Sequence, residues 1–252
     1  MKALITGASS GIGADMARVL VEEGYDVILV ARRKGKLEKL AKELGENAKI
    51  IVKDISSTYN CVELYNEVKK EDIDILINNA GFGMCGFFND INLDKELDMI
   101  DLNIKSLHTL TKLFLKDFVK KDRGYILNVG SSAGFMPGPL MTTYYSTKNY
   151  VVSFTSALYE ELRRSSSNVS VSCLCPGPVE TEFNKVARVK FTIKGAKSKE
   201  VAKYAIKKMF EEQLIIVPTL KMKLALFFTK FIPRKTLLKI TYKIQEKKTK
   251  WI

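Results

Sequence analysis

Short apolar segments of strand type alternate with amphipathic segments of helical type from the second residue of the chain onward. The predicted strands are Lys2–Thr6, Asp26–Ala31, Lys49–Val52, Ile73–Asn78, Tyr125–Gly130, Val169–Cys175 and Leu214–Val217. The predicted helices are Ile12–Glu23, Lys34–Leu44, Tyr59–Lys70, Leu93–Val119, Tyr144–Ser165 and Ser198–Gln213. This alternation predicts an α/β fold: a single-domain, doubly wound parallel sheet of seven strands, of the Rossmann type, with helices on both faces.

The length of 252 residues and the 46% content of hydrophobic residues suffice for a well-buried core. No linker rich in Ser, Gly or Pro divides the chain, so we expect one catalytic domain over residues 1–220 and a dependent extension over residues 221–252. The formal net charge is +13, and the extension alone holds ten Lys and Arg against the single Glu246. The basicity therefore belongs to the extension and does not indicate nucleic-acid binding by the domain.

The first apolar run is too short for a secretory signal, and none approaches the roughly 18 to 20 residues of a membrane-spanning helix. We therefore expect a cytoplasmic protein. The four scattered cysteines and the single His108 offer neither a disulfide framework nor an evident zinc site. We expect reduced thiols and no bound metal.

The first predicted strand runs into a glycine-rich turn, Thr6-Gly7-Ala8-Ser9-Ser10-Gly11-Ile12-Gly13, and then into a helix. Gly7 permits a tight turn, Gly11 lets a pyrophosphate approach the backbone, and Gly13 lets the helix pack closely on the strand. Free amides at the start of the helix would face the anion. The turn therefore predicts a dinucleotide site, whose further members are Ser9, Ser10 and Ile12.

The end of the second predicted strand bears on the choice of nicotinamide cofactor. An acidic residue there binds the ribose 2′-hydroxyl, whereas a basic one accommodates a 2′-phosphate. Here the sequence is Ala31-Arg32-Arg33, and either Arg32 or Arg33 could bind a phosphate through two hydrogen bonds. The alternative is that both arginines only solvate the strand end. The pattern favours NADP(H) over NAD(H).

A second constellation lies in the middle of the chain. Ser131 precedes Tyr144 by thirteen residues, and Lys148 follows Tyr144 by four. Positions i and i+4 share one face of a helix, so the ammonium of Lys148 is expected beside the phenol of Tyr144 and would favour its ionised form. Without such help a phenol, with a reference pKa near 10, is a poor acid or base at neutral pH.

The glycine turn and this spacing together resemble the short-chain dehydrogenase/reductase family, and the resemblance covers about residues 1–220. It implies that Asp54, with Ile55 beside it, contacts the adenine. The Asn78-Asn79-Ala80-Gly81 motif implies that Asn79, Ala80 and Gly81 line the cofactor groove. In the motif that runs from Pro176 and Gly177 to Thr181, the backbone of Val179 and the hydroxyl of Thr181 would hold the nicotinamide amide.

The resemblance also implies a catalytic set and an activity. Ser131 would orient a substrate carbonyl, Tyr144 would protonate its oxygen as hydride arrives from the cofactor, and Asn103 would hold a water in a proton relay. Tyr144 and Lys148 would also contact the cofactor, Lys148 through the nicotinamide ribose. We therefore expect an NADP(H)-dependent oxidoreductase that interconverts a carbonyl and an alcohol, and reduces a lipophilic or acyl-type ketone. The family also implies a homodimer or homotetramer.

Two other functions fit parts of the sequence. Gly130-Ser131-Ser132-Ala133-Gly134 matches the G-x-S-x-G turn of serine hydrolases, with Ser132 as nucleophile. Such an enzyme needs a histidine after the serine, whereas His108 precedes it, so we reject this function. A cofactor-binding sensor or scaffold without turnover is the other alternative. Its sequence mark would be loss of Tyr144 or Lys148, and both are present.

Residues 182–198 occupy the place of the family's substrate lid. Apolar and cationic residues interleave there: Phe183, Val186, Val189 and Phe191 with Lys185, Arg188, Lys190, Lys194 and Lys197. An apolar pocket with a cationic mouth would suit an acyl or isoprenoid-like carbonyl that carries a negative group, although a solvated loop would look the same.

Within the extension, Lys235, Lys239, Lys243 and Lys247 recur every four residues, opposite Leu237, Ile240 and Ile244. Such a basic amphipathic helix could lie on an anionic membrane surface, here the inner face of the cell membrane, and bring the enzyme to a lipophilic substrate. Alternatively, its apolar face packs on the domain or on a partner subunit. The sequence leaves both possibilities open.

Overall fold

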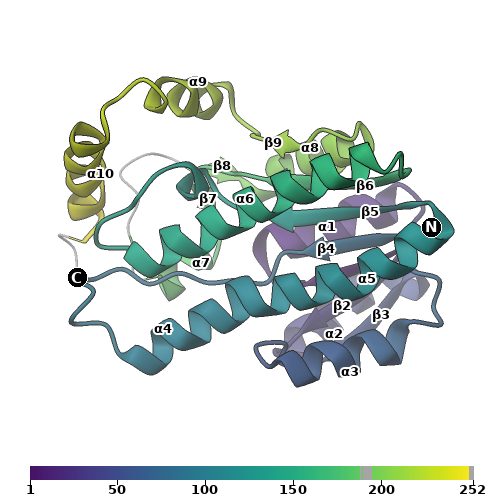
Figure 1. The fold of residues 1–252 in the computed structure, drawn as a ribbon. Coiled ribbons are helices and arrows are strands. Elements are labelled where there is room, and N and C mark those ends of the chain that lie inside the picture. Colours follow the sequence, from purple (N-terminus) through teal and green to yellow (C-terminus); the bar gives the residue numbers. More distant parts are fainter. Residues whose placement is uncertain (188, 190–194, 250–252) are drawn as a thin grey trace.

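The computed structural model describes residues 1–187, 189 and 195–249 (Figure 1). Within them, seven parallel strands form one sheet in the order β3-β2-β1-β4-β5-β6-β9, which confirms the predicted fold class. The strands are β1 (Lys2–Thr6), β2 (Asp26–Ala31), β3 (Ala48–Val52), β4 (Ile75–Asn78), β5 (Gly124–Val129), β6 (Val169–Leu174) and β9 (Ile215–Ile216). β7 (Val179–Glu180) and β8 (Ala196–Lys197) pair separately, in parallel, and were not expected from the sequence.

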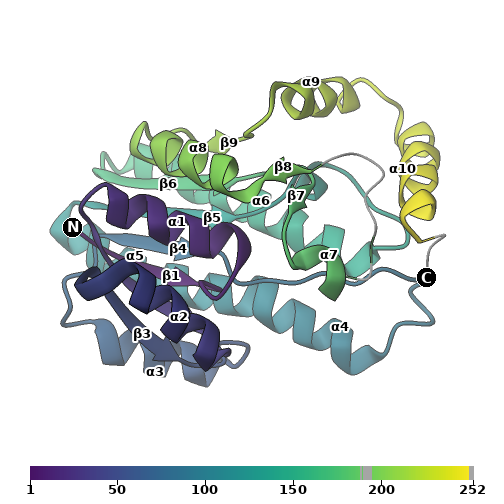
Figure 2. The same ribbon diagram turned by 180° about the vertical axis from the view of Figure 1, so that it is seen from behind.

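Helices cover both faces of the sheet (Figures 1 and 2). One face carries α1 (Gly11–Glu22), α2 (Lys34–Leu44) and α8 (Ser198–Phe210). The other carries α3 (Thr58–Val68), α5 (Leu107–Lys121) and α6 (Thr142–Arg164), with α4 (Leu93–Ile100) leading into α5. After β9, the chain continues in α9 (Leu220–Thr229) and α10 (Arg234–Thr249). No helix among the described residues has the length and apolar character needed to span a bilayer.

The central strands are buried on both sides, because successive side chains enter opposite layers of the core. In β1, Ile5 packs under α1 and α8, while its neighbour Leu4 packs under α3 and α5. In β4, Ile77 and Leu76 divide in the same way. Near-continuous apolar strands of this kind explain why the sequence shows runs of Val, Ile and Leu rather than a polar alternation.

The long helix expected over Leu93–Val119 is interrupted. A π-helical segment, η2 (Asp101–Ser106), joins α4 to α5 and carries Asn103. Such segments occur often at functional sites, because the wider turn shifts the direction of the side chains. The sequence shows no glycine or proline in this segment, so nothing in its composition predicted the interruption.

All seven strands point the same way, so their carboxyl ends meet at one edge of the sheet. The glycine turn follows β1, Asn79 follows β4, and Ser131 lies two residues after β5. The strand order reverses direction between β1 and β4, and ligands of such sheets bind beside this switch point. The topology therefore brings the predicted nucleotide and catalytic residues to one place.

The packing of α5 on the sheet yields a stability prediction. Phe118 is 1% exposed, and its ring centroid lies 6.1 Å from that of Phe114. Phe118→Ala should lower the free energy of unfolding by about 3 to 5 kcal/mol, because it leaves a cavity in the core. The adjacent Val119 is 46% exposed, so Val119→Ala should change it by less than about 0.5 kcal/mol. Urea unfolding followed by circular dichroism measures both, and equal losses would contradict this packing.

Candidate active site

The glycine turn is built against the loop that follows β4. Gly7 and Gly11 adopt φ angles of +65° and +57°, which side-chain-bearing residues rarely adopt. A Cβ at Gly13 would lie 2.3 Å from Nδ2 of Asn79, so only glycine fits there. The same Nδ2 donates to the carbonyls of Thr6, at 3.0 Å, and Gly7, at 3.2 Å. Asn79 thus fixes the shape of the turn and uses its amide for the backbone rather than for a ligand.

The arginines after β2 lie at the outer side of this turn. Arg33 donates to the hydroxyls of Ser9, at 2.9 Å, and Ser10, at 2.7 Å. Its other amino group donates to Glu182, at 2.6 Å. Arg32 instead pairs with Asp54, at 3.3 Å. The structure therefore brings Arg33 to the glycine turn and Arg32 to the expected adenine side.

Two residues of this cluster did not emerge from the sequence. Lys36, in the first turn of α2, also binds Glu182, so that one carboxylate bridges two cations. The hydrogen bonds from Lys36 and Arg33 lower the pKa of Glu182 to about 2. The position of Lys36, three residues after Arg33, was a signal that the sequence offered. The place of Glu182, 149 residues after Arg33, was not.

Ser131, Tyr144 and Lys148 come together, as their spacing predicted. Ser131 precedes the short 3₁₀ helix η3 (Ser132–Phe135), and its Oγ accepts a hydrogen bond from the Ala133 amide at 3.1 Å. Its hydroxyl also lies close enough to the phenol of Tyr144 to oppose the rise in the pKa of that group. The Nζ of Lys148 lies 6.0 Å from the centroid of the Tyr144 ring and donates to the carbonyl of Val129 at 2.8 Å.

Burial governs the protonation of both groups on α6. It raises the pKa of Tyr144 to about 12, against the opposing hydrogen bond from Ser131. It lowers the pKa of Lys148 to about 8. We expected the ammonium to favour the ionised phenol; in the structure its Nζ donates to the Val129 carbonyl, and burial is the main cause of the pKa shift of Tyr144. Tyr144 is therefore protonated at neutral pH and available as a proton donor.

Asn103 is buried and connects two parts of the site. Its Oδ1 accepts from the amide of Phe82 at 3.1 Å, and its Nδ2 donates to the Phe82 carbonyl at 2.9 Å and to Oγ1 of Thr147 at 3.1 Å. A Cβ added to Gly81 would lie 2.9 Å from Oδ1 of Asn103 and 3.6 Å from Nζ of Lys148. The π-helical segment thus places Asn103 beside Gly81 and Lys148.

Ala80 and Ile55, which were predicted to contact the cofactor, are held in the fold by other groups. The amide of Ala80 donates to Oγ1 of Thr6, and the side chain of Ile55 is buried.

The segment after β6 contacts both the catalytic and the nucleotide residues. The carbonyl of Pro176 accepts from the amide of Ser132 at 2.9 Å. Val179 is buried in β7, and the Cγ2 of Thr181 would lie 3.1 Å from a Cβ at Gly11. Gly177 faces α9, where a Cβ would lie 2.5 Å from the Cε of Met222. The segment therefore runs from the catalytic serine side to the glycine turn.

The expected lid is partly described. In α7 (Phe183–Val186), the ring of Phe183 lies 5.3 Å from that of Tyr144. Val189 is buried in one apolar cluster with Met141 and Ala187. Val186, Lys185 and Lys197 are exposed. The remaining lid residues, Arg188, Lys190, Phe191 and Lys194, lie outside the described residues.

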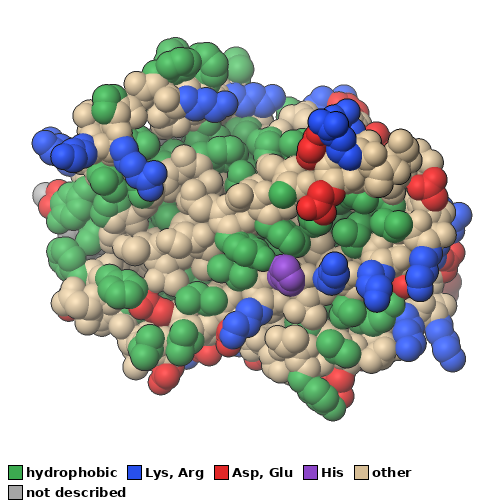
Figure 3. Space-filling model, in the orientation of Figure 1, with side chains coloured by type: hydrophobic (Ala, Val, Ile, Leu, Met, Phe, Trp, Pro, Cys, Tyr) green, Lys and Arg blue, Asp and Glu red, His purple; other side chains and the backbone are tan. Residues whose placement is uncertain are grey.

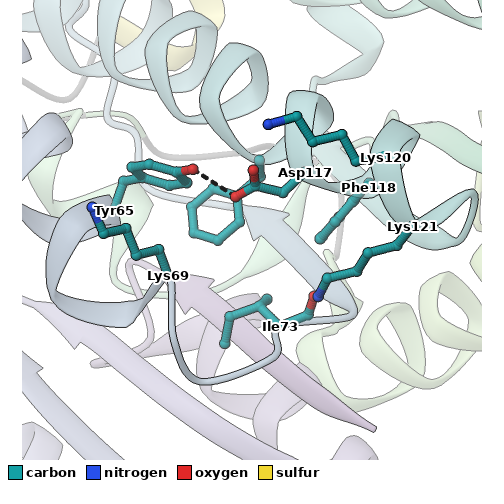
Figure 4. A pocket seen from close by; sticks show the side chains of 8 residues that line it. Tyr65, Lys69, Ile73, Asp117, Phe118, Lys120 and Lys121 are labelled. Carbon is teal, nitrogen blue, oxygen red and sulfur yellow. Dashed lines mark hydrogen bonds between the residues drawn. The ribbon is translucent and has the colours of Figure 1, made fainter.

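The single histidine and the pocket between α3 and α5 both lie apart from the predicted catalytic residues. His108 pairs through Nδ1 with the hydroxyl of Tyr150 at 2.7 Å, so it is engaged between α5 and α6 rather than at Ser132. A pocket of about 320 Å³ lies between α3 and α5, where Tyr65 donates to Asp117 at 2.6 Å (Figure 4). It is lined by none of the predicted catalytic or nucleotide residues.

The close approach at Gly13 yields a prediction. Gly13→Ala should raise the dissociation constant for NADPH at least about tenfold, because the new methyl group must displace Asn79 and distort the glycine turn. Gly35, in the first turn of α2, has nothing within 4 Å of an added Cβ. Gly35→Ala should therefore leave binding unchanged and raise the free energy of unfolding by up to about 1 kcal/mol. Calorimetric titration and thermal unfolding measure both, and unaltered binding in Gly13→Ala would refute this account of the turn.

Comparison with known proteins agrees with the resemblance that the sequence motifs indicated. The family model for short chain dehydrogenase matches residues 1–190. The very-long-chain 3-oxoacyl-CoA reductase of Homo sapiens is 34% identical over 194 residues, which are 74% of this chain and 62% of that protein. The match thus spans less than two thirds of this relative.

Solved structures agree with the fold. A short-chain dehydrogenase from Sphingobium yanoikuyae in complex with NADPH matches with a TM-score of 0.82 and 30% identity, over 91% of this chain and 93% of that one. The 3-ketoacyl-(acyl-carrier-protein) reductase from Brucella melitensis, complexed with NADH, matches with a TM-score of 0.76 and 27% identity, over 86% of this chain and 96% of that one. With the glycine turn at the switch point and Ser131, Tyr144 and Lys148 beside it, these matches show that the chain belongs to the short-chain dehydrogenase/reductase family, whose enzymes are oxidoreductases that use a nicotinamide cofactor on small-molecule substrates.

Proposed function

We propose that the protein is an NADP(H)-dependent reductase of a lipophilic, acyl-type ketone. The observation that carries the proposal is the convergence of Ser131, Tyr144 and Lys148 at the carboxyl edge of the sheet, beside the glycine turn. An acid is what the reduction of a carbonyl requires at neutral pH. The catalytic domain of the proposal comprises residues 1–220, and residues 221–252 are its extension.

The proposed reaction assigns one task to each catalytic side chain. When bound, the cofactor supplies a hydride to the carbonyl carbon. The hydroxyls of Ser131 and Tyr144 bind the carbonyl oxygen, and Tyr144 gives it a proton as negative charge develops there. We assign Lys148 to the ribose hydroxyls of the cofactor, and Asn103 to positioning the path along which Tyr144 is reprotonated.

The preference for NADP(H) rests on the cations beside the glycine turn. Arg33 and Lys36 converge on one carboxylate, that of Glu182, and an anion bound by two cations is the arrangement that a 2′-phosphate requires. Arg33 also binds the hydroxyls of Ser9 and Ser10, so it lies against the predicted pyrophosphate turn. No carboxylate follows β2 to bind a free 2′-hydroxyl.

The substrate class is supported by the surroundings of Tyr144 and by the human relative. Met141, Phe183 and Val189 form an apolar cluster around the phenol. Lys185 and Lys197 are exposed on the segments that flank it. An apolar wall with cations near its border suits a 3-oxoacyl thioester of a coenzyme or carrier, the type of substrate named for the human relative.

We further propose an intracellular homodimer or homotetramer. Leu93 and Leu97 on α4 are 65% and 46% exposed, which supports a subunit contact along this helix. The extension is proposed to contact a membrane peripherally.

The first test is turnover. Wild-type protein should oxidise NADPH, followed at 340 nm, with a 3-oxoacyl thioester within a set of steroid, aromatic, sugar and diketone carbonyls. Tyr144→Phe should lower kcat by about 10² to 10⁴-fold and change the dissociation constant for NADPH by less than about threefold, because the proton donor is lost while the other cofactor contacts are kept. Tyr59→Phe, at a 70% exposed tyrosine, is the control. Tight NADPH binding by the wild type without turnover of any carbonyl would favour the sensor or scaffold.

The second test concerns the cofactor. Arg33→Ala should weaken NADPH binding by about 10- to 100-fold, and NADH binding by less than about threefold, because it removes a charge-assisted hydrogen bond to the 2′-phosphate. Glu182→Gln should act in the opposite direction and tighten NADPH binding by about 3- to 10-fold, since its exposed ion pairs compete with the phosphate. Calorimetric titration measures all four values, with Lys34→Ala as the control for a lost exposed charge. A parallel change for NADPH and NADH would refute the assignment of Arg33.

A further inference from the structure

The helix α9 has two apolar faces, and among the described residues only one of them packs on the domain. On the inner face, Leu226 is buried in a cluster with Val217, and Met222 lies against Gly177. The helix also approaches the 3₁₀ turn Ser132–Phe135. These contacts fix α9 on the domain and account for part of its apolar composition.

The opposite face of α9 is an exposed apolar surface, which we call the outer stripe. Leu220, Leu224, Phe227 and Phe228 lie on α9 at the spacing of one helical face, and Phe231 adds to the stripe from the turn that follows the helix. All five are more than half exposed, from 51% for Leu224 to 71% for Leu220. The ring of Phe227 contacts those of Phe228, at 5.6 Å, and Phe231, at 5.3 Å. Figure 3 shows these hydrophobic side chains at the top of the molecule, over α9.

Positive charge surrounds the outer stripe. By helical periodicity, Lys221 borders it on one side and Lys223 and Lys230 on the other, and all three are exposed. The exposed residues Arg234, Lys235, Lys239 and Lys243 follow on α10. Glu246 is the single carboxylate within residues 221–252. An apolar aromatic strip between lysines fits a surface that is apolar below and anionic above.

We propose that the outer stripe docks α9, in the plane of the interface, on a membrane surface that contains anionic lipids. The aromatic rings would enter the boundary between headgroups and acyl chains, and the lysines would meet the lipid phosphates. A second copy of the chain fits less well, because two extensions with a charge of +9 each would repel one another.

The docked orientation would also serve the proposed reaction, and this step rests on the proposed function. Gln245 on α10 donates to the hydroxyl of Tyr145, the neighbour of Tyr144, and its side chain is 1% exposed. The inner face of α9 contacts the turn after Ser131. The two helices of the extension thus join the catalytic groups to the membrane-facing surface, so a lipophilic substrate would enter beside them.

The test is co-sedimentation of the full-length protein with vesicles of phosphatidylcholine containing 30% phosphatidylglycerol, and with vesicles of phosphatidylcholine alone. We expect binding to the anionic vesicles that weakens as salt is raised. The double substitution Phe227→Ser and Phe228→Ser should lower the partition coefficient at least fivefold, and Lys221→Glu with Lys230→Glu should do the same. Both variants should retain the wild-type dissociation constant for NADPH, which keeps this test independent of turnover.

Two matched controls accompany these variants. Tyr59→Ser with Val62→Ser removes apolar residues that are exposed on α3, and Lys42→Glu with Lys203→Glu reverses two exposed charges on α2 and α8. Neither should reduce binding. The proposal is overturned if the wild type does not bind anionic vesicles, or if the α9 variants bind as the wild type does. It is equally overturned if the serine variant converts a dimer to a monomer in sedimentation velocity while vesicle binding is unchanged.

Discussion

The hydroxyl of Thr6 joins the ends of β1 and β4 at the centre of the predicted nucleotide site. Its Oγ1 accepts from the amides of Asn79, at 3.0 Å, and Ala80, at 3.1 Å, and donates to the carbonyl of Ile77 at 3.3 Å. One side chain thereby satisfies the backbone groups where β1 and β4 end, and unpaired amides there would each cost about 1 to 3 kcal/mol. Because the ends of these two strands are held together, the side chain of Asn79 reaches the carbonyls of Thr6 and Gly7 and fixes the glycine turn.

Desolvation then sets the chemistry of the groove. The same burial raises the pKa of Tyr144 and lowers that of Lys148, so it favours the neutral form of both. A neutral phenol can donate a proton, and the hydrogen bond from Ser131 stabilises the phenolate that remains. The fold therefore keeps the phenol protonated, which is the form that carbonyl reduction requires, while the charge effect that the i to i+4 spacing suggested stays a prediction.

The sequence predicted those features of the fold and of the site that depend on residues close together in the chain. Apolar runs defined the strands, and the glycine turn and the Ser131 to Lys148 spacing located the residues that the sheet brings to one edge. It could not predict contacts between distant segments, such as Glu182 with Arg33 and Lys36, because neither partner carries a local signature of the other. Nor could it predict the π-helical segment at Asn103, since the segment contains no glycine or proline and the hydrogen bonds of the asparagine reach Phe82, 21 positions away in the chain.

In the extension, the hydrophobic pattern of the sequence did not show which apolar side chains are buried. Residues 220–231 carry apolar side chains on two sides of the helix with Lys221, Lys223 and Lys230 between them, and the sequence posed packing and membrane contact as alternatives. In the structure these alternatives are compatible. On α10, Leu237, Thr241 and Gln245 are buried while Lys239 and Lys243 are exposed, and on α9 one apolar face is buried while the other is exposed. A helix that is apolar on both sides satisfies a core with one side and is left with a surface that needs a second partner.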